Sequence, residues 1–544
     1  MAEEKYVLSL YDVRGIQEFI FSSSKLKENI GASILVAKVL SKRLKEAVEK
    51  LGQVIVDWEE ADEFKILKDE NINAEIVYAG GGNAMVAYRN KDIAIKATKT
   101  LSKIILEETG GALRFSVAHI DTNFTNFTED RQKLIKELRE NKEETIETFP
   151  LLGIAITKQG TTDGLPAVKK VDRDFISLPA FLKREEEEKE KGYFDYLLGN
   201  FKNDYKFPRE FDQLGQRMGE RHLAVVHIDG NNMGKMIEGV IKDVEDYNEA
   251  GQRIRKFSKE ITEYYKDAAK CVVKKIIENL KWRQLKDKIE LIWDETDNKL
   301  YLPFRPLVLN GDDVTFVTDG RLGIAVAEEF LREISKKSVN GKTLSACAGV
   351  AIVKTHFPFY RAYQLAERLC SSAKLKGKII ALNAKSEMKE SWLDFHIVYS
   401  GIRTELNELR KRQYNVPGME EAEGLKKEES GEIIMKYDQF NLLWRPWCVA
   451  GDCEEKYKWR NFKKIFEKMF EDSNKKWPRS KLKDLRDEFL KGKEAVEFFV
   501  RFCENRDKKL PEFNGNNEIF RDNQTPYFDA LELLDFYIEL EDSP

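Results

Sequence analysis

Hydrophobic and polar residues alternate along the first 120 residues in runs that predict a strand, a helix, a hairpin, a second helix and a last strand. A β-forming run, Tyr6–Tyr11, ends at Asp12, and a helical pattern begins at Gly15 and continues to Leu51. Two β-rich runs around a glycine turn then predict a hairpin, followed by a helix and a strand. These later elements are Ala74–Tyr78, Ala84–Tyr88, Ala94–Glu108 and Leu113–Ile120.

The same order of elements returns after residue 220. A strand, Leu223–Ile228, ends at Asp229, and the hairpin, helix and last strand follow as Pro306–Leu309, Val314–Val317, Leu322–Lys336 and Leu344–Val353. The step from the hairpin turn to the last strand is about thirty residues in both units, which indicates a duplication. A split βαβ unit of this order is ferredoxin-like, with an antiparallel sheet and helices on one face. We therefore expect a nucleotidyl-transfer site on the other, exposed face.

The predicted fold class is α+β, with two ferredoxin-like palm domains, a connector and a C-terminal helical domain. At 544 residues the chain is too long for one ordinary domain. We divide it at 1–125, 126–219, 220–400 and 401–544, with a helical insertion at about 240–300 in the second palm. Less regular features are a charged helix at Glu129–Glu147, a charge run at Lys183–Lys191 that favours a solvated helix or mobile segment, a long helix at Glu245–Trp282 and a candidate linker at Pro417–Gly431.

Composition narrows the chemistry. The 91 basic and 95 acidic residues give a net charge of −4, which excludes a chain-wide basic surface but not a local groove for nucleic acid. With no signal-peptide pattern and no apolar run long enough for a membrane helix, we expect a cytoplasmic protein. None of the five histidines is followed by Asp, and the six cysteines form no C-x-x-C pair. Cys271, Cys347 and Cys370 fit core positions. Cys448 and Cys453 could be a pair of metal ligands, but two ligands without partners do not make a metal site.

Carboxylates at the second hairpin are the strongest catalytic candidates. Asn310 and Gly311 both tolerate the positive φ of a tight hairpin turn, so Asp312 and Asp313 could merely keep an exposed turn soluble. Asp229 argues against that reading, because the end of the first strand lies beside the hairpin tip in a ferredoxin-like sheet. Three clustered carboxylates repel one another unless cations neutralise them, and hard oxygen ligands suit two Mg²⁺ or Mn²⁺ ions in phosphoryl transfer.

Two further features could contact phosphates. The segment Gly230–Gly234, with Asn231 and Asn232, precedes a helix, so its N–H groups could face a triphosphate or simply start that helix. Lys374 lies on the helical stretch Ala362–Lys376 after the last strand and could aim an ammonium at phosphates, although a surface role, or a shift to Lys376 or Lys378, stays open. His227 could be a core histidine that faces away from the site.

The first unit lacks the carboxylate pair. Its hairpin has Gly82 and Asn83 where the second has Asp312 and Asp313, although Asp12 still ends its first strand. One unit could therefore bind a nucleotide while the other runs the reaction. The alternative is that Gly80–Gly82 only permits a tight turn or close packing between the units.

Together these residues resemble a known family, the large palm-domain subunit of type III CRISPR effector complexes, which is related to GGDEF-type cyclases. The resemblance covers most of residues 5–125 and 220–385. The matching segments are YDVRGIQEFIF (11–21) with GAS at 31–33, YAGGGN (78–83), HIDGNNMG (227–234), LPFRPLVLNGDDVTFV (302–317) and LAERLCSSAK (365–374).

The resemblance implies that the second palm binds two Mg²⁺ or Mn²⁺ ions and joins ATP into cyclic oligoadenylates when target RNA is bound. It implies Asp229, Asp312 and Asp313 as catalytic metal ligands and other effector subunits, guide RNA and target RNA as partners, with no membrane. The implied nucleotide contacts are Gly230, Asn231, Asn232, Gly234, Asn310, Gly311 and Lys374, with Gly81, Gly82 and Asn83 near the second ATP.

Three departures from the family pattern qualify these expectations. Asn310 replaces the first glycine of the hairpin motif, and the segment Lys158–Ala167 has no cysteine, so zinc is not expected there. No histidine-aspartate nuclease domain precedes the first strand, so we expect no degradation of single-stranded DNA by that route. Two alternatives stay open: a scaffold that binds nucleotide without turnover, and a palm cyclase that makes another nucleotide product.

Overall fold

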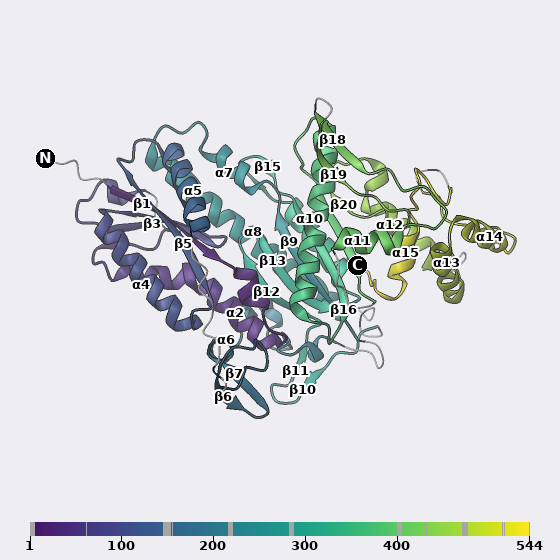
Figure 1. The fold of residues 1–544 in the computed structure, drawn as a ribbon, viewed down its shortest axis with the longest axis horizontal. Coiled ribbons are helices and arrows are strands. Elements are labelled where there is room, and N and C mark those ends of the chain that lie inside the picture. Colours follow the sequence, from purple (N-terminus) through teal and green to yellow (C-terminus); the bar gives the residue numbers. More distant parts are fainter. Residues whose placement is uncertain are drawn as a thin grey trace.

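The computed structural model describes residues 6–60, 63–144, 154, 156–215, 221–281, 285, 288–399, 405–429, 432–470, 477–513, 515 and 517–542. Mixed α and β structure with several sheets confirms the predicted α+β class. Figure 1 shows the N-terminal sheet at one end, a second sheet in the middle and the C-terminal helices at the other end. No helix among the described residues is both long and apolar enough to cross a membrane.

The first sheet has the predicted ferredoxin-like core. Its strand order is β2-β3-β4-β1-β5, and β1 pairs antiparallel with both β4 and β5. The predicted single helix from Gly15 to Leu51 is instead α1, α2, a π-helical turn (Val39–Arg43) and α3, with non-helical residues between α1 and α2. The elements are β1 (Tyr6–Arg14), α1 (Ile16–Phe21), α2 (Leu26–Lys38), α3 (Leu44–Glu49), β2 (Val54–Ile55), β3 (Ala74–Gly80), β4 (Asn83–Tyr88), α4 (Lys91–Thr109) and β5 (Arg114–Thr122).

The second sheet repeats this order and extends it. Its order is β12-β13-β9-β16-β17-β20, so β12, β13, β9 and β16 correspond to β3, β4, β1 and β5. Runs of β-branched and other apolar residues buried on both faces explain why these strands form. The elements are β9 (His222–Gly230), α7 (Met233–Ile241), α8 (Tyr247–Lys281), β12 (Phe304–Asn310), β13 (Asp313–Asp319), α9 (Gly323–Ser335), β16 (Ala346–Lys354), α10 (Phe359–Asn383), β17 (Ser391–Ile397) and β20 (Trp447–Ala450).

Neither face of the second sheet is left open. Even-numbered residues of β9, such as Val226, share a core with α8 and α9. Odd-numbered ones, such as Val225, share a core with α10 and with α1 and α2 of the first palm. The expected exposed face is therefore wrong, because α10 and the first palm cover it. The site is confined to the strand ends.

The long insertion joins the two palms. Helix α8 matches the predicted Glu245–Trp282, except that Trp282 lies outside the described residues. Arg255 of α8 forms a buried ion pair with Glu75 of β3 (2.7 Å) and donates to the carbonyl of Val77 (2.9 Å). Removing either partner would leave a buried charge unpaired and would lower the free energy of unfolding by about 3–5 kcal/mol. The pair therefore fixes the second palm's insertion against the first palm.

The connector departs from the prediction. It contains α5 (Phe127–Glu144), β6 (Ala167–Val171), β7 (Asp174–Ser177), α6 (Leu178–Lys189) and β8 (Tyr205–Lys206), and residues 145–147 of the charged helix predicted at Glu129–Glu147 lie outside the described residues. The charge run at Lys183–Lys191 is not a solvated helix, since Lys183 is only 4% exposed and donates to the carbonyl of Phe19. Glu186 pairs with Lys38 of α2. A Cβ at Gly31 would lie 1.8 Å from the Lys183 carbonyl oxygen, so this glycine allows α2 and α6 to approach.

The C-terminal part is mainly helical. Its elements are α11 (Leu406–Tyr414), β18 (Leu425–Glu429), β19 (Glu432–Tyr437), α12 (Trp459–Phe470), α13 (Arg479–Lys491), α14 (Lys493–Glu504) and α15 (Phe528–Glu532), and short strands elsewhere are β10 (Trp293–Asp294), β11 (Lys299–Tyr301), β14 (Ser338–Val339) and β15 (Lys342–Thr343). The predicted linker at Pro417–Gly431 contains strand β18, while residues 430 and 431 lie outside the described part. Cys271 is exposed, contrary to the core position expected for it, whereas Cys347 and Cys370 are buried as expected.

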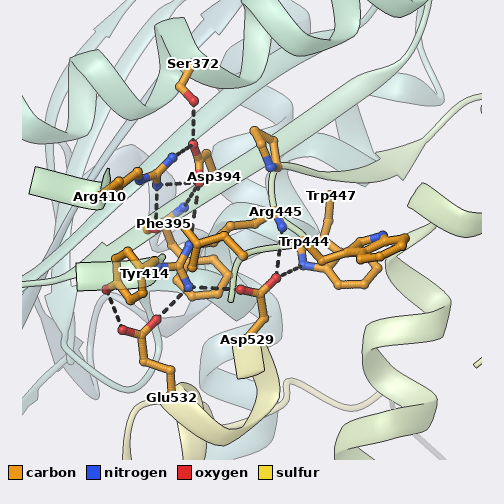
Figure 2. Close-up of polar contacts among 12 residues, drawn as sticks. Ser372, Asp394, Phe395, Arg410, Tyr414, Trp444, Arg445, Trp447, Asp529 and Glu532 are labelled. Carbon is orange, nitrogen blue, oxygen red and sulfur yellow. Dashed lines mark hydrogen bonds and ion pairs between the residues drawn. The ribbon is translucent and has the colours of Figure 1, made fainter. Parts of the chain in front are cut away.

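A buried ion network attaches this part to the second palm (Figure 2). Arg410 of α11 donates two hydrogen bonds to Asp394 of β17 (2.8 and 2.9 Å), and Ser372 of α10 donates a third (2.7 Å). Arg445 pairs with Asp529 (3.2 Å) and Glu532 (2.6 Å) in α15. The network crosses the domain boundary that we placed at residue 400, and strand β20, which lies beyond that boundary, joins the sheet of the second palm. The domain boundary at residue 400 stays a prediction.

Candidate functional site

Two carboxylates face each other where β9 meets β13. Asp313 is the first residue of β13 and lies directly opposite Asp229 in the antiparallel register, which places both side chains on one face. The turn between β12 and β13 consists of Gly311 and Asp312, and Gly311 has φ 63°. Asn310, expected within the turn, is instead the last residue of β12 and pairs with Asp313. The sequence motif therefore forms the expected hairpin, shifted by one residue.

Helix α10 supplies the positively charged side chain of the site, Lys374. Lys374 Nζ donates to Asp229 Oδ2 and to the carbonyl oxygen of Gly230 (3.0 Å). Lys376 is directed elsewhere and donates to the carbonyls of Trp444 and Pro446. Although burial lowers the pKa of Lys374, the Asp229 carboxylate raises it above the ordinary value, so the lysine is charged. Of the two lysines, the structure therefore brings Lys374 to the site.

The hairpin carboxylates are held in an environment that disfavours their charge. Burial, and then repulsion from Asp229, raises the pKa of both Asp312 and Asp313 to about 7. Gln17 of α1 donates to Asp313 Oδ2 (3.0 Å), while Asp313 Oδ1 is buried without a hydrogen-bond partner among the described residues. An added cation at this edge would relieve both the repulsion and the unsatisfied oxygen.

Sequence reasoning missed several residues that line the site. His227 Nδ1 lies 3.6 Å from Asp313 Oδ1, so His227 faces the site and the expectation that it faces away is wrong. Tyr265 of α8 approaches from the opposite face, since a Cβ on Gly230 would lie 2.8 Å from its hydroxyl. The period of two between His227 and Asp229 was a usable signal, and Gln17 lies in a quoted segment. Tyr265 gave no signal, because it reads as a core residue of a long helix.

The segment after Asp229 is tied to neighbouring structure. The Asn231 N–H donates to the carbonyl of Ser345 (2.9 Å), so this amide is not free to face a triphosphate as expected. Its side chain donates to Ser345 Oγ (3.0 Å), and the Asn232 side chain donates to the carbonyl of Met388 (2.9 Å). Asn232 adopts φ 58° before α7 begins. These contacts fix the start of α7 and leave Gly234 as the open position, since a Cβ added there would meet nothing within 4 Å outside its own helix turn.

The two hairpins meet between the palms. A Cβ on Gly311 would lie 3.1 Å from the Cα of Gly81, so only glycines allow this approach. A cavity of about 410 Å³ adjoins the contact, which is within the range of small-molecule sites. Its lining includes Gly80, Gly82, Asn310 and Gly311 from the hairpins, aromatic Trp58 and Tyr196, and Lys259 and Lys266 of α8. The predicted hairpin residues Gly82, Asn310 and Gly311 are thereby brought to one cavity, whereas Asp229, Asp312 and Asp313 lie outside its lining.

The carboxylate oxygens are suitable ligands for a divalent cation, but the protein side chains alone do not complete its coordination. Hard cations prefer carboxylate oxygens, and Asp313 Oδ1 has no hydrogen-bond partner among the described residues. Within those residues no group of three or more His, Cys, Asp or Glu side chains is arranged to hold a metal ion. Magnesium at nucleotide sites is typically held by one or two carboxylates together with phosphates. Asp229 and Asp313 suit that mode of binding.

Comparison with protein families gives a match for the second palm. Residues 222–380 match the model of the Cas10/Cmr2 second palm domain. This segment of the Cas10/Cmr2 type contains Asp229, the hairpin carboxylates and Lys374, and the match confirms the resemblance drawn from the sequence. No curated protein matches the chain by sequence.

Solved structures share the fold of nearly the whole chain. Csm1 from T. onnurineus superposes with a TM-score of 0.53 at 13% identity, covering 98% of this chain and 70% of that one. A Csm1–Csm4 cassette in complex with one ATP gives 0.53 at 12% identity, covering 99% and 70%. A cassette in complex with cA4 gives 0.51 at 12% identity, covering 98% and 70%. At such identities these likenesses show a common fold.

Proposed function

We propose that this protein is the palm subunit of a type III CRISPR effector complex, and that it binds ATP and divalent cations and joins ATP into cyclic oligoadenylates when target RNA is recognised. The observation that carries this proposal is the cross-strand pair of Asp229 and Asp313 with Lys374 bound to Asp229, in a segment that matches the Cas10/Cmr2 second palm. Structural relatives in complex with ATP, cA3 and cA4 support nucleotides of this class as ligands.

The acidic side chains would bind metal ions, and the lysine would bind phosphate. Asp229 and Asp313 would hold one or two Mg²⁺ or Mn²⁺ ions, with Asp312 beside them at the turn. When bound, such ions neutralise phosphate charge and lower the pKa of a ribose hydroxyl that attacks an α-phosphate. Lys374, which contacts Asp229, would bind a phosphate oxygen of the nucleotide through its ammonium group.

The first palm would complete the site from the other side. Gln17 would orient the Asp313 carboxylate through the hydrogen bond to Oδ2, which leaves Oδ1 directed at the cation. The cavity beside Gly82 and Gly311 would take a nucleoside, with aromatic Trp58 and Tyr196 among its walls. The partners we propose are other type III subunits, with guide RNA and target RNA reached through the complex, and Csm4 beside Csm1 in the similar structures supports a subunit partner.

A direct test measures product formation by the purified protein in its RNA-guided complex, with cognate target RNA, labelled ATP and Mg²⁺ or Mn²⁺. We expect oligoadenylates from the wild type and a loss of at least about a hundredfold in Asp312→Ala plus Asp313→Ala, because the transition-state charge then lacks its cation. Asp487→Ala, an exposed carboxylate on α13, serves as the matched control.

The product distinguishes the proposal from its alternatives. Mass spectrometry that finds a different phosphodiester product would retain the site and replace the substrate assignment. ATP binding without any turnover under activating conditions would favour the scaffold. Undiminished synthesis in Asp312→Ala plus Asp313→Ala would contradict a catalytic role for the hairpin.

A further inference from the structure

A buried tyrosine hydroxyl beside the second hairpin has no hydrogen-bond partner. Tyr265 of α8 is completely buried, and its Oη makes no hydrogen bond within the part of the chain that the structure describes. A buried hydroxyl without a partner destabilises a fold, so nearly all such groups in folded proteins are bonded. The unpaired oxygen of Tyr265 therefore requires an explanation.

The ring of Tyr265 does not provide that explanation. It packs against Phe330 of α9, with the ring centroids 5.9 Å apart, and belongs to the hydrophobic core between α8 and the second sheet. Phenylalanine would fill this position and would bury no polar atom. Packing therefore accounts for the aromatic ring of Tyr265 but not for its hydroxyl.

The hydroxyl lies in the space that Gly230 leaves at the end of β9. A Cβ on Gly230 would lie 2.8 Å from Tyr265 Oη and 2.9 Å from the Cβ of Asp312. The absence of a side chain at Gly230 thus lets the tyrosine hydroxyl and the Asp312 side chain adjoin the same point. Gly230 directly follows Asp229, so this point lies at the edge of the sheet where the carboxylates meet.

Asp312 is the carboxylate on the tyrosine's side of the sheet. Side chains alternate along a strand, so Asp229 and the open position at Gly230 lie on opposite faces of β9, and Tyr265 approaches on the Gly230 face. Burial and then the charges of Asp312 and Asp229 raise the pKa of Tyr265 well above its ordinary value, so the hydroxyl keeps its proton and stays a donor.

The other two carboxylates already have donors from helices. Lys374 of α10 donates to Asp229, and Gln17 of α1 donates to Asp313 (3.0 Å). Carboxylates that hold a metal ion are usually oriented by hydrogen bonds of this kind. Tyr265 of α8 is placed to supply the third.

We propose that Tyr265 is a positioning residue of the candidate site, and that its hydroxyl donates a hydrogen bond to the Asp312 carboxylate when a divalent cation is bound. This bond would occupy one oxygen of Asp312 and leave the other for the cation. The unpaired hydroxyl is thus a cost to the cation-free protein that cation binding removes. The inference rests on the proposed function, because it adds a residue to the cation site which that function requires.

The test compares cation affinity with the stability of the cation-free protein. Mn²⁺ is titrated into the full-length protein and followed by electron paramagnetic resonance, and Asp312→Asn shows which bound Mn²⁺ belongs to the hairpin. Tyr265→Phe should weaken that Mn²⁺ about tenfold, as is typical when a hydrogen bond to a metal ligand is removed. In EDTA the same variant should unfold at the wild-type temperature or above it, because its hydroxyl has no partner to lose.

Tyr527→Phe is the matched control. Tyr527 is also completely buried, but its hydroxyl donates to the carbonyl of Pro511 (2.8 Å) in the C-terminal part. This variant should unfold at a lower temperature than the wild type in EDTA, because it loses a buried hydrogen bond, and it should bind Mn²⁺ with wild-type affinity.

The proposal is overturned if Tyr265→Phe binds the hairpin Mn²⁺ as tightly as the wild type does. It is also overturned if the unfolding temperature of Tyr265→Phe in EDTA falls as far as that of Tyr527→Phe, since the hydroxyl would then have a partner without the cation. If Asp312→Asn leaves Mn²⁺ binding unchanged, the hairpin is not a cation site, and the proposed function fails together with this inference. The first two results leave the hairpin Mn²⁺ in place, so the two failures are distinguishable.

Discussion

At the scale of the residue, the hairpin places charge where the fold disfavours it. Asp313 is only 29% exposed, faces Asp229 across the ladder and has one oxygen unsatisfied among the described residues. Burial and that neighbour raise the pKa of Asp313 to about 7, so the folded protein without cations binds protons more tightly than the unfolded chain does. The site is therefore built at a cost in stability that a cation would offset.

This cost predicts that Asp313→Asn stabilises the cation-free protein above pH 7. The ionised aspartate costs stability in full above its folded pKa, and the cost disappears as pH falls from 7 towards 4, where the unfolded chain also takes up the proton. We expect a gain of about 1–2 kcal/mol at pH 8 and none near pH 4. Thermal unfolding at both pH values measures the difference.

Two comparisons check the assignment of this gain. Asp487→Asn changes an exposed carboxylate and should shift the unfolding midpoint at neither pH. Addition of Mg²⁺ should stabilise the wild type more than Asp313→Asn, because the cation neutralises the carboxylate that the variant lacks. A gain that is equal at pH 8 and pH 4 would contradict the electrostatic explanation.

At the scale of the element, helix α10 positions Lys374 by packing closely on β16. A Cβ on Gly349 would lie 2.0 Å from the carbonyl oxygen of Ala366 and 2.3 Å from the N of Cys370, both on α10. No side chain fits there unless the helix moves away from the sheet. The glycine in β16 thus sets the distance from which Lys374 reaches Asp229.

We expect Gly349→Ala to push α10 outwards and to weaken both stability and nucleotide binding. Overpacking of this kind costs about 1–3 kcal/mol, and displacement of Lys374 should lower ATP affinity severalfold. Thermal unfolding and calorimetric titration with a non-hydrolysable ATP analogue measure the two effects. Gly239→Ala on α7, where the nearest atom is the end of the Lys342 side chain at 3.5 Å, should leave both unchanged.

Elements with a strong local pattern were predictable from the sequence. Both hairpins, α8 and the strands that end at Asp12 and Asp229 follow from β-rich runs, glycine turns and helical periodicity. The charge run at Lys183–Lys191 was not, because composition cannot show that Glu186 has a buried partner in Lys38, far away in the sequence. Gln17 was missed for the same reason, because its place at the site depends on a hydrogen bond to Asp313, which is distant in the chain.

At the scale of the whole molecule, the C-terminal part is joined to the second palm by paired buried charges (Figure 2). Arg410 and Arg445 are matched by Asp394, Asp529 and Glu532, and all five are almost completely buried. Ser372 and Lys376 belong to α10, the helix that carries Lys374. Helix α10 is therefore one path by which a change in the C-terminal part would reach the candidate site.

Arg445→Met should loosen this attachment without unfolding the palms. Loss of the guanidinium leaves Asp529 and Glu532 without their cation and removes the 3.9 Å contact of Arg445 Nε with Asp394 Oδ1 of β17. Breaking a buried pair in this way costs about 3–5 kcal/mol. We expect faster hydrogen exchange in β20 and α15, and in α10 near Ser372, with β1 and β4 of the first palm unaffected. Arg460→Met removes an exposed pair with Glu455 and should change exchange in β20 little, since such pairs contribute about 0–1 kcal/mol. Wild-type protection of β20 in Arg445→Met would show that β-pairing and apolar packing hold the two parts together, and that the ion network does not carry the connection to α10.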